Sequence, residues 1–331
     1  MKAIVYDKYG LTDVLQLKEV DKPMPNDDEV LVKVHAVSVN DWDWQLLQGI
    51  PFVNRMMAGL LKPTKIRILG CDIAGRVEAV GKNVQAFREG DDVFGDLSGC
   101  GFGGFAEYVC ADEKALSFKP EEMTFEQAAT LPQAGLLALQ GLREKGELQP
   151  GQKVLINGAS GGAGTFAVQI AKSFGAEVTG VCSTKKMAFV RSVGADHVID
   201  YTQEDFTRNG HHYDLILDMQ AHHSIIDCRR SLTPNGVYLL VGGTNARVFQ
   251  TILLGPLISL TGSKRMRLLL HKPNKNMSLL LALFKAGKVV PVIDRVYPLS
   301  ETADAMRYFG EGHKKGKVLI TLDETSAKQN A

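Results

Sequence analysis

A run of small residues follows a short apolar segment in the middle of the chain. Residues 154–156 (VLI) are typical of a strand buried on both faces, and residues 164–174 have the apolar spacing of a helix. Small residues let a phosphate approach the backbone, and a helix N-terminus offers free N–H groups and a positive dipole end. The loop therefore predicts a dinucleotide pyrophosphate site at Gly158, Ala159, Ser160, Gly161, Gly162, Ala163 and Gly164.

The small residues of this loop match the G-x-G-x-x-G pattern of dinucleotide-binding proteins at two of its three glycine positions. Gly161 and Gly164 match its second and third glycines, and Ala159 stands at the first. Sites for NAD carry an acidic residue about twenty residues further on, which binds the ribose 2′-hydroxyl. Here residues 181–186 read VCSTKK, without a carboxylate. A hydroxyl and two lysines can hold a 2′-phosphate, so the sequence favours NADPH over NADH.

The loop belongs to a region in which strands and helices alternate. Predicted strands at 178–181, 197–201, 215–217 and 237–241 are separated by predicted helices, which indicates a doubly wound parallel sheet over residues 121–262. Residues 1–120 have short strands and many glycines, as in a small barrel-like β domain. Residues 263–331 have helix and then strand signals, and we expect them to return to the first domain. The predicted fold class is α/β.

Several further motifs occur in a characteristic order. They are GCDIAGRV at 70–77, VGKNV at 80–84, GDDVFG at 90–95, LPQAG at 131–135 and GAD at 194–196. With the phosphate loop, they resemble the medium-chain dehydrogenase/reductase superfamily over essentially the whole chain, and most of all its zinc-independent, quinone-oxidoreductase-like branch. The resemblance implies a GroES-like catalytic domain and a Rossmann domain that binds NADPH.

The resemblance also implies roles for single residues. Ser183, Lys186 and Tyr201 match positions beside the NADPH 2′-phosphate. Gly242 and Gly243 match a stretch that passes the nicotinamide ribose. Asn40 and Asp43 match an N-x-x-D pattern at the nicotinamide end of the site, and Gln45 is a further polar candidate near the substrate. The candidate catalytic residues are therefore Asn40, Asp43 and Gln45.

The expected chemistry depends on whether a metal is bound. Zinc-dependent relatives carry a cysteine where this chain has Asn40 and a His-Glu pair where it has Cys71-Asp72, so no metal is expected. The alternative is a makeshift site of Cys71 with Asp43 or Asp72. Without a Lewis acid, quinones and α,β-unsaturated carbonyls are the easier hydride acceptors, because conjugation spreads the developing charge. We therefore expect an NADPH-dependent quinone or enone oxidoreductase; an NADPH-binding sensor or scaffold and an alcohol dehydrogenase-like carbonyl reductase remain alternatives.

Composition and net charge limit the kinds of partner and compartment that we expect for the protein. The 331 residues carry a formal net charge of +1, which gives no electrostatic reason to expect nucleic acid. The weakly polar stretch 248–263 contains Gly255 and Pro256 and is too short for a membrane span. Five cysteines without C-x-x-C spacing indicate free thiols, and we expect a cytoplasmic protein. In similar proteins two Rossmann sheets often join edge to edge, so a homodimer is expected.

Overall fold

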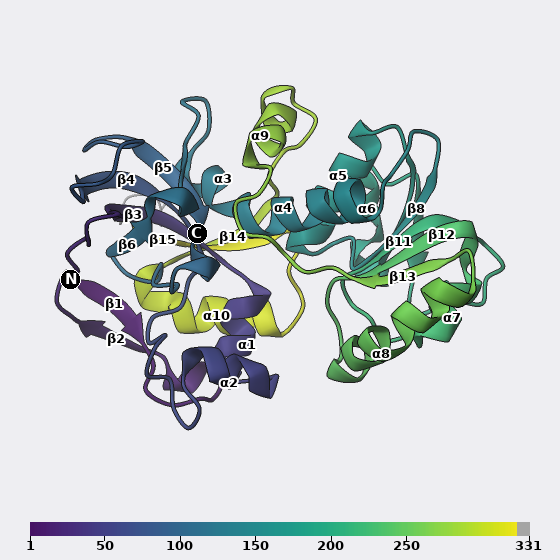
Figure 1. Cartoon of the computed structure of the whole chain (residues 1–331), viewed down its shortest axis with the longest axis horizontal. Helices are drawn as coiled ribbons and strands as arrows, with labels where there is room; N and C mark the ends of the chain where they lie inside the picture. The colour runs from purple at the N-terminus through teal and green to yellow at the C-terminus, as the bar shows by residue number, and fades with distance from the viewer. Residues whose placement is uncertain (323–331) are drawn as a thin grey trace. The chain divides into compact units, whose positions relative to one another are not determined.

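The structure is a computed structural model that describes residues 1–322 (Figure 1). The chain forms two compact units. Unit 1 comprises Met1–Gln133, Pro273–Met277 and the described residues from Ile293 onward, and unit 2 comprises Ala134–Lys272 and Ser278–Val292.

Unit 1 is built on a seven-stranded, mainly antiparallel sheet. Its strand order is β14-β15-β3-β4-β5-β7, and β6 pairs with β3 beside this path. The strands are β3 (Glu29–Val39), β4 (Asp72–Val80), β5 (Asp92–Asp96), β6 (Tyr108–Asp112), β7 (Ser117–Phe118), β14 (Ile293–Pro298) and β15 (Lys317–Thr321). A separate antiparallel pair consists of β1 (Lys2–Val5) and β2 (Gln16–Glu19).

The long strand β3 shows how sequence alternation sets the core of unit 1. Val30, Val32 and Val34 are buried in one hydrophobic cluster, and the alternation then shifts by one residue to Val37 and Val39. The pairing of β3 with β4 shifts register between Val34 and Ala36, which is the mark of a β-bulge. The bulge therefore keeps apolar side chains on the core face after the alternation changes.

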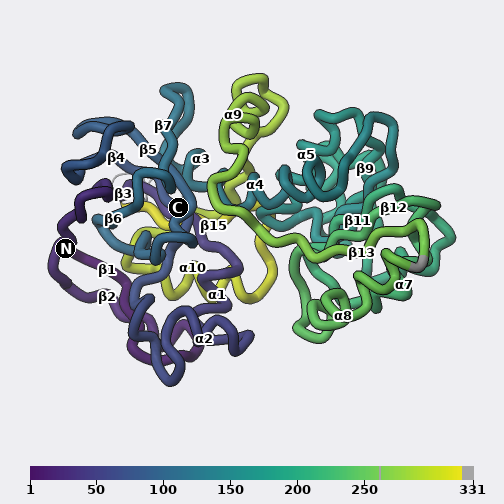
Figure 2. The backbone as a smooth tube through the Cα atoms, viewed as in Figure 1, coloured from purple at the N-terminus to yellow at the C-terminus, as the bar shows by residue number. Residues whose placement is uncertain are grey.

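The last described strand lies beside this early one. β15, which Figure 2 colours yellow, pairs antiparallel with β3, with Val318 opposite Val39. Its other neighbour is β14. The C-terminal strands thus share a sheet with strands from the first third of the chain.

The described part of unit 1 contains four α-helices: α1 (Asp41–Gln48), α2 (Phe52–Ala58), α3 (Phe125–Thr130) and α10 (Thr302–Gly310). The sequence pattern predicts only strands in the first third, so α1 and α2 differ from expectation. Both are short, and a two-turn helix carries little periodic signal. α3 packs against β3 and β4, which carries the boundary of unit 1 to Gln133, beyond the predicted residue 120.

Unit 2 contains a six-stranded parallel sheet in the order β10-β9-β8-β11-β12-β13. This is the 3-2-1-4-5-6 order of a Rossmann fold, so the predicted doubly wound sheet is confirmed. Its strands are β8 (Lys153–Asn157), β9 (Glu177–Cys182), β10 (His197–Asp200), β11 (Tyr213–Asp218), β12 (Leu232–Leu240) and β13 (Arg265–Leu268).

Helices cover both faces of this sheet, with α5 and α6 on one face and α7 and α8 on the other (Figure 1). The helices are α4 (Pro132–Leu139), α5 (Gly162–Ser173), α6 (Met187–Ser192), α7 (Ile225–Arg230), α8 (Asn245–Thr261) and α9 (Met277–Lys285). α3 and α4 follow one another as separate helices, because Pro132 starts a new helix rather than continuing the old one. Residues 263–272, which the sequence analysis joined to the C-terminal segment, stay with unit 2 because β13 pairs with β12.

Among residues 1–322, none of the helices has the length and apolar character needed to cross a bilayer.

Candidate functional site

The phosphate loop connects β8 to α5 at the point where the strand order of unit 2 reverses. β8 has β9 on one side and β11 on the other, and the helices that follow β8 and β11 lie on opposite faces of the sheet. Ligands of open α/β sheets bind at this switch point. A Cβ at Gly158, whose φ is +87°, would lie 3.0 Å from Cγ of Gln220 in the loop after β11. The two loops therefore meet at the predicted site.

Gly164 fits α5 tightly against this loop. A Cβ on Gly164 would lie 2.1 Å from the carbonyl oxygen of Gly158 and 2.8 Å from Cα of Ala159. Any side chain here would separate the helix from the strand. At Gly161 the corresponding Cβ would lie 3.4 Å from the same carbonyl oxygen, which is an ordinary contact. The two glycines therefore have different roles, packing at Gly164 and open backbone at Gly161.

The N-terminus of α5 offers unpaired donors. Its N-cap is Gly161, no side chain caps it, and its first turn holds no acidic residue. The first N–H groups of a helix have no partner within the helix, and the dipole favours an anion. A dinucleotide pyrophosphate fits this end of α5, and the backbone of residues 161–164 would hold it.

A buried polar network that the sequence analysis missed supports the loop. Asn157, at the end of β8, donates from Nδ2 to Oδ1 of Asp218 at 2.8 Å and to the Gln220 carbonyl at 3.1 Å. The Tyr238 hydroxyl donates to Oδ2 of Asp218 at 3.0 Å. Burial raises the pKa of Asp218, whereas these two side-chain hydrogen bonds lower it. Asp218 thus ties the ends of β8, β11 and β12 together; a polar residue ending a buried apolar strand was the available signal.

The predicted ribose end lies where β9 and β10 finish side by side. Ser183 follows β9, and Lys186 ends the single turn 184–186. The backbone N–H of Tyr201 donates to the Cys182 carbonyl at 3.1 Å, which brings the 62% exposed Tyr201 to the same sheet edge. The structure therefore gathers Ser183, Lys186 and Tyr201, and their role toward a 2′-phosphate stays a prediction.

A carboxylate stands at this edge as well, contributed by the neighbouring strand. Asp200, the last residue of β10, accepts hydrogen bonds from the Thr184 hydroxyl at 2.5 Å and the Thr202 hydroxyl at 2.8 Å. The Thr184 hydrogen bond is the main reason why the pKa of Asp200 is lowered. This edge of the sheet therefore has a carboxylate, that of Asp200, although residues 181–186 contain none.

Gly242 and Gly243 follow β12 at the same edge. Gly243 has a φ of +139°, and a Cβ there would lie 2.6 Å from the Ala221 backbone nitrogen. The Ala221 N–H donates to the Gly242 carbonyl at 3.0 Å. The backbones of the loops after β11 and β12 are therefore in direct contact, and only glycine fits at 243.

The N-x-x-D pattern of unit 1 forms the start of α1. Asn40 is the N-cap, and its backbone N–H donates to Oδ2 of Asp43 at 2.9 Å within a capping box. Oδ1 of Asp43 accepts from the Gly70 N–H at 2.8 Å, so the carboxylate joins α1 to the segment before β4. Asp43 is fully buried, and burial raises its pKa to about 7 against these two hydrogen bonds. The contacts of Asp43 are structural, and its catalytic role stays a prediction.

The Asn40 side chain lies within a buried polar cluster. Its Nδ2 donates to Oδ2 of Asp72 at 3.0 Å, and its Oδ1 accepts from Nζ of Lys317 at 2.5 Å. Lys317 is 3% exposed and lies 3.8 Å from Oδ2 of Asp72. Burial raises the pKa of Asp72 and lowers that of Lys317, while their mutual attraction opposes both shifts. Lys317 was not singled out from the sequence, and Asp72 was named only for the alternative metal site, because the two residues are 245 positions apart in the chain.

Gln45 lies one turn further along α1 and is partly exposed. Its Nε2 donates to Oδ2 of Asp41 at 2.5 Å, and its Oε1 accepts from Nδ2 of Asn54 at 3.4 Å. A polar group that keeps some contact with solvent can turn toward a ligand, so Gln45 stays a candidate.

Three buried side chains of unit 1 have the chemistry of metal ligands. Cys71 Sγ and one carboxylate oxygen each from Asp72 and Asp96 lie within 4.8 Å of one another. Burial, together with the neighbouring carboxylates, raises the pKa of the Cys71 thiol well above its usual value. The sequence analysis named Cys71 with Asp43 or Asp72, and the structure adds Asp96 from β5.

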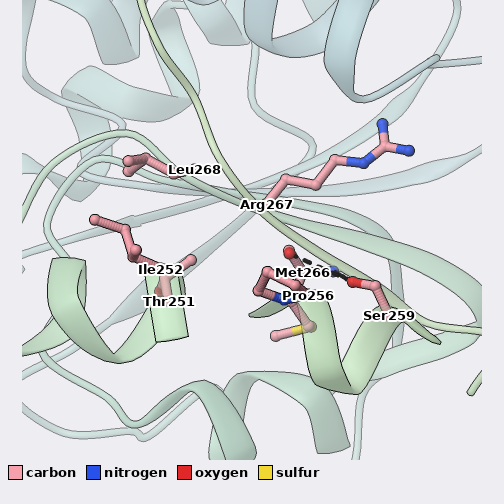
Figure 3. A pocket seen from close by; sticks show the side chains of 7 residues that line it. All are labelled: Thr251, Ile252, Pro256, Ser259, Met266, Arg267 and Leu268. Atoms are coloured by element: carbon pink, nitrogen blue, oxygen red, sulfur yellow. Dashed lines mark hydrogen bonds between the residues drawn. The ribbon is translucent and has the colours of Figure 1, made fainter. Parts of the chain in front are cut away.

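A separate hollow of unit 2 lies between α8 and β13 (Figure 3). It has a volume of about 350 Å³. Its lining is mostly apolar and comprises Thr251, Ile252, Pro256, Ser259, Met266, Arg267 and Leu268. It lies at the edge strand of the sheet, away from the switch point between β8 and β11.

Comparison with known proteins places the chain in a family. Residues 26–121 match the alcohol dehydrogenase GroES-like domain, and residues 193–320 match the zinc-binding dehydrogenase model. A chloroplast envelope quinone oxidoreductase homolog from Arabidopsis thaliana is 34% identical over 333 residues, covering 97% of this chain and 98% of the relative. The chain belongs to the quinone oxidoreductases of the medium-chain dehydrogenase/reductase superfamily.

Two further relatives agree with this assignment. An NADPH-dependent alkenal/one oxidoreductase from Arabidopsis thaliana chloroplasts is 34% identical over 334 residues, covering 97% of this chain and 79% of the relative. The solved quinone oxidoreductase from Coxiella burnetii has a TM-score of 0.87 at 31% identity and covers 98% of this chain and 99% of that one. The predicted GroES-like and Rossmann architecture is confirmed, and the chain is an oxidoreductase that uses a nicotinamide cofactor.

One of the two matching domain models is named for zinc binding, and the candidate ligands of this chain do not suit a zinc ion. Catalytic zinc requires three free protein ligands and an open fourth position. Cys71 and Asp72 are instead hydrogen-bonded by Asn40, with the Lys317 ammonium nearby. These residues do not fit a zinc ion in the chain as it stands.

Proposed function

We propose that the chain is an NADPH-dependent reductase of quinones or α,β-unsaturated carbonyls that works without zinc. The observation that carries the proposal is the uncapped N-terminus of α5 beside Gly158 and Gly164, with Ser183, Lys186 and Tyr201 at the neighbouring strand ends. The names of two relatives, quinone oxidoreductase homolog and NADPH-dependent alkenal/one oxidoreductase, support the same substrate classes.

In this proposal the protein mainly binds and orients. NADPH supplies a hydride when bound. The backbone of residues 161–164 holds the pyrophosphate, and Lys186 and Ser183 hold the 2′-phosphate by charge and hydrogen bonding. A conjugated acceptor spreads the charge that develops on its oxygen, so proximity and a few donors suffice, with solvent as the proton source. Lys317 and Asp72 fix the Asn40 amide at its 4% exposed position.

The test is NADPH oxidation with three acceptors: an ortho-quinone, an alkenal and a simple aldehyde. Each is repeated with NADH and with a chelator. Turnover of the quinone or alkenal that prefers NADPH and ignores the chelator is expected. Turnover of the aldehyde alone, abolished by the chelator, would contradict the proposal. Tight NADPH binding without turnover of any acceptor would instead favour a sensor or scaffold.

Lys186 should decide the preference for NADPH. A hydrogen bond to a charged group contributes about 1.5–3 kcal/mol, so Lys186→Ala should raise the KM for NADPH roughly 10- to 100-fold. The KM for NADH should stay within about twofold, because NADH has no 2′-phosphate to lose that contact. Lys185→Ala, in the same turn, is the matched control. Equal changes for both cofactors would assign Lys186 a structural role.

We propose further that a second copy of the chain covers α8 and β13. β13 is an edge strand, and the exposed apolar residues Phe249, Leu253, Leu257 and Leu260 of α8 follow helical spacing, with Leu253 68% exposed. Edge strands and exposed apolar rows of this kind are usually covered in native proteins.

Leu253→Glu should therefore shift the protein from dimer to monomer in light scattering. Leu61→Glu, at a 90% exposed leucine of unit 1, is the control and should leave the mass unchanged. A monomeric wild type, or a dimer that survives Leu253→Glu, would contradict the homodimer.

The compartment proposed is the cytoplasm. The described residues include all five cysteines, and each is a free thiol. Free thiols persist in a reducing compartment.

A further inference from the structure

The buried thiol and carboxylates of unit 1 converge because two strands meet in register. Asp72, at the start of β4, lies opposite Asp96, at the end of β5, and Cys71 precedes Asp72 in the chain. All three residues have 0% exposure. One thiolate and two carboxylates form a ligand set that zinc and similar divalent ions accept.

Protein donors already use the lone pairs of this group. The Asn40 Nδ2 lies 3.0 Å from Oδ2 of Asp72 and 3.4 Å from Sγ of Cys71. The Gln133 backbone N–H lies 3.1 Å from both oxygens of Asp72, and the Gln133 Nε2 lies 3.6 Å from Sγ of Cys71. Two of the three potential ligands are therefore hydrogen-bonded from more than one side.

The ammonium group of Lys317 also lies beside these side chains. Nζ of Lys317 is 2.5 Å from Oδ1 of Asn40 and 3.8 Å from Oδ2 of Asp72, and the lysine is 3% exposed. Buried charges in proteins are paired, and here Lys317 interacts electrostatically with Asp43, Asp72 and Asp96. A divalent ion bound at the same carboxylates would meet this ammonium at close range.

We propose that Lys317, acting through Asn40, is the resident cation of the Cys71–Asp72–Asp96 group and keeps divalent metals out of it. The lysine neutralises the carboxylates that would attract a metal, and it orients the Asn40 amide so that its N–H groups point at Cys71 and Asp72. The three side chains thus have the chemistry of metal ligands, but their charge is neutralised and their lone pairs accept hydrogen bonds from the protein. The inference does not depend on which substrate the enzyme reduces.

The test uses Co²⁺ as the probe, because a cobalt–thiolate site absorbs visibly and a hexaaqua ion barely does. Lys317→Met removes the ammonium and keeps an apolar stem of similar length. We expect this variant to bind one Co²⁺ per chain, with a thiolate-to-cobalt band and a thermal midpoint that rises with Co²⁺. Addition of Cys71→Ser should abolish the band. The wild type should show neither the band nor the shift at the same Co²⁺ concentration.

Lys119→Met is the matched control, because Lys119 is also buried in unit 1 and pairs with Asp92 at 3.6 Å instead. It should bind no Co²⁺. If Lys317→Met does not fold, Lys317→Gln retains a donor for Asn40 and removes only the charge. A Cys71-dependent cobalt band in the wild type would overturn the proposal, as would the failure of both neutral variants to bind Co²⁺, whether they fold or not.

Discussion

Gly164→Ala should weaken NADPH binding roughly 10- to 100-fold, because hydrogen bonds to a charged phosphate contribute about 1.5–3 kcal/mol each and would be lost. The new Cβ would lie 2.1 Å from the Gly158 carbonyl oxygen, which is backbone and cannot move aside as a side-chain tip can. α5 must therefore shift away from β8, and the N–H groups in its first turn would no longer point toward the pyrophosphate. NADPH titration followed by fluorescence measures the change.

Two control variants separate packing from ligand approach. Gly161→Ala meets only an ordinary contact of 3.4 Å, so the thermal midpoint should stay near that of the wild type. A methyl group there would still face a pyrophosphate, so NADPH binding should fall while stability does not. Gly99→Ala, which meets nothing within 4 Å, should change neither property. Unaltered NADPH affinity in Gly164→Ala would contradict the phosphate site.

Asp43→Asn should remove a large part of the pH dependence of stability. The folded-state pKa of Asp43 is raised to about 7 from an ordinary 3.8, mainly by burial. Folding therefore takes up a proton between these values, and the unfolded chain holds fewer protons. The stabilisation by the protonated carboxyl is complete at low pH and is lost as pH rises toward 7, at about 1.4 kcal/mol per pH unit.

The measurement is the free energy of unfolding in urea at several values between pH 4.5 and 7.5. The wild type should lose its advantage over Asp43→Asn as pH rises, because asparagine does not titrate. The exposed Asp13→Asn serves as the control and should run parallel to the wild type. An advantage of the wild type that grows with pH would show that the Asp43 carboxylate is stabilised in its charged form instead.

The nucleotide-binding half of the fold could be predicted because its signals are local. An apolar run, small residues and a helix follow one another at residues 154–174, so neighbours in sequence are neighbours in space. The strands of unit 2 could be predicted from similar local runs of apolar residues. Helix α1 was missed as an element, although its N-cap Asn40 and capping partner Asp43 were both noted. At eight residues it carries too little periodicity to stand out.

The buried cluster in unit 1 could not be predicted in the same manner. Asn40, Asp72 and Lys317 belong to β-sheet pairings between distant segments, and no local pattern records which strands pair. Similarly, Asp218 and Asp200 are unremarkable acids in sequence until adjacent strands bring them to Asn157 and Thr184. The residue types that suit the chemistry could be identified from the sequence. The hydrogen-bond partners that decide the role of each residue come from distant segments and depend on the tertiary structure.

The pairing of β15 with β3 has a consequence for biosynthesis. The Lys317–Asn40 hydrogen bond joins residues 277 positions apart. At roughly 5–20 residues per second, the ribosome supplies Lys317 about 15–55 s after Asn40. By the end of that interval all the strands of unit 2 have been synthesised, whereas β3 still has an open edge and the carboxylates of Asp72 and Asp96 still lack Lys317. The nascent chain is therefore expected to need protection at β3, by a holding chaperone or by the exit tunnel, until β15 emerges.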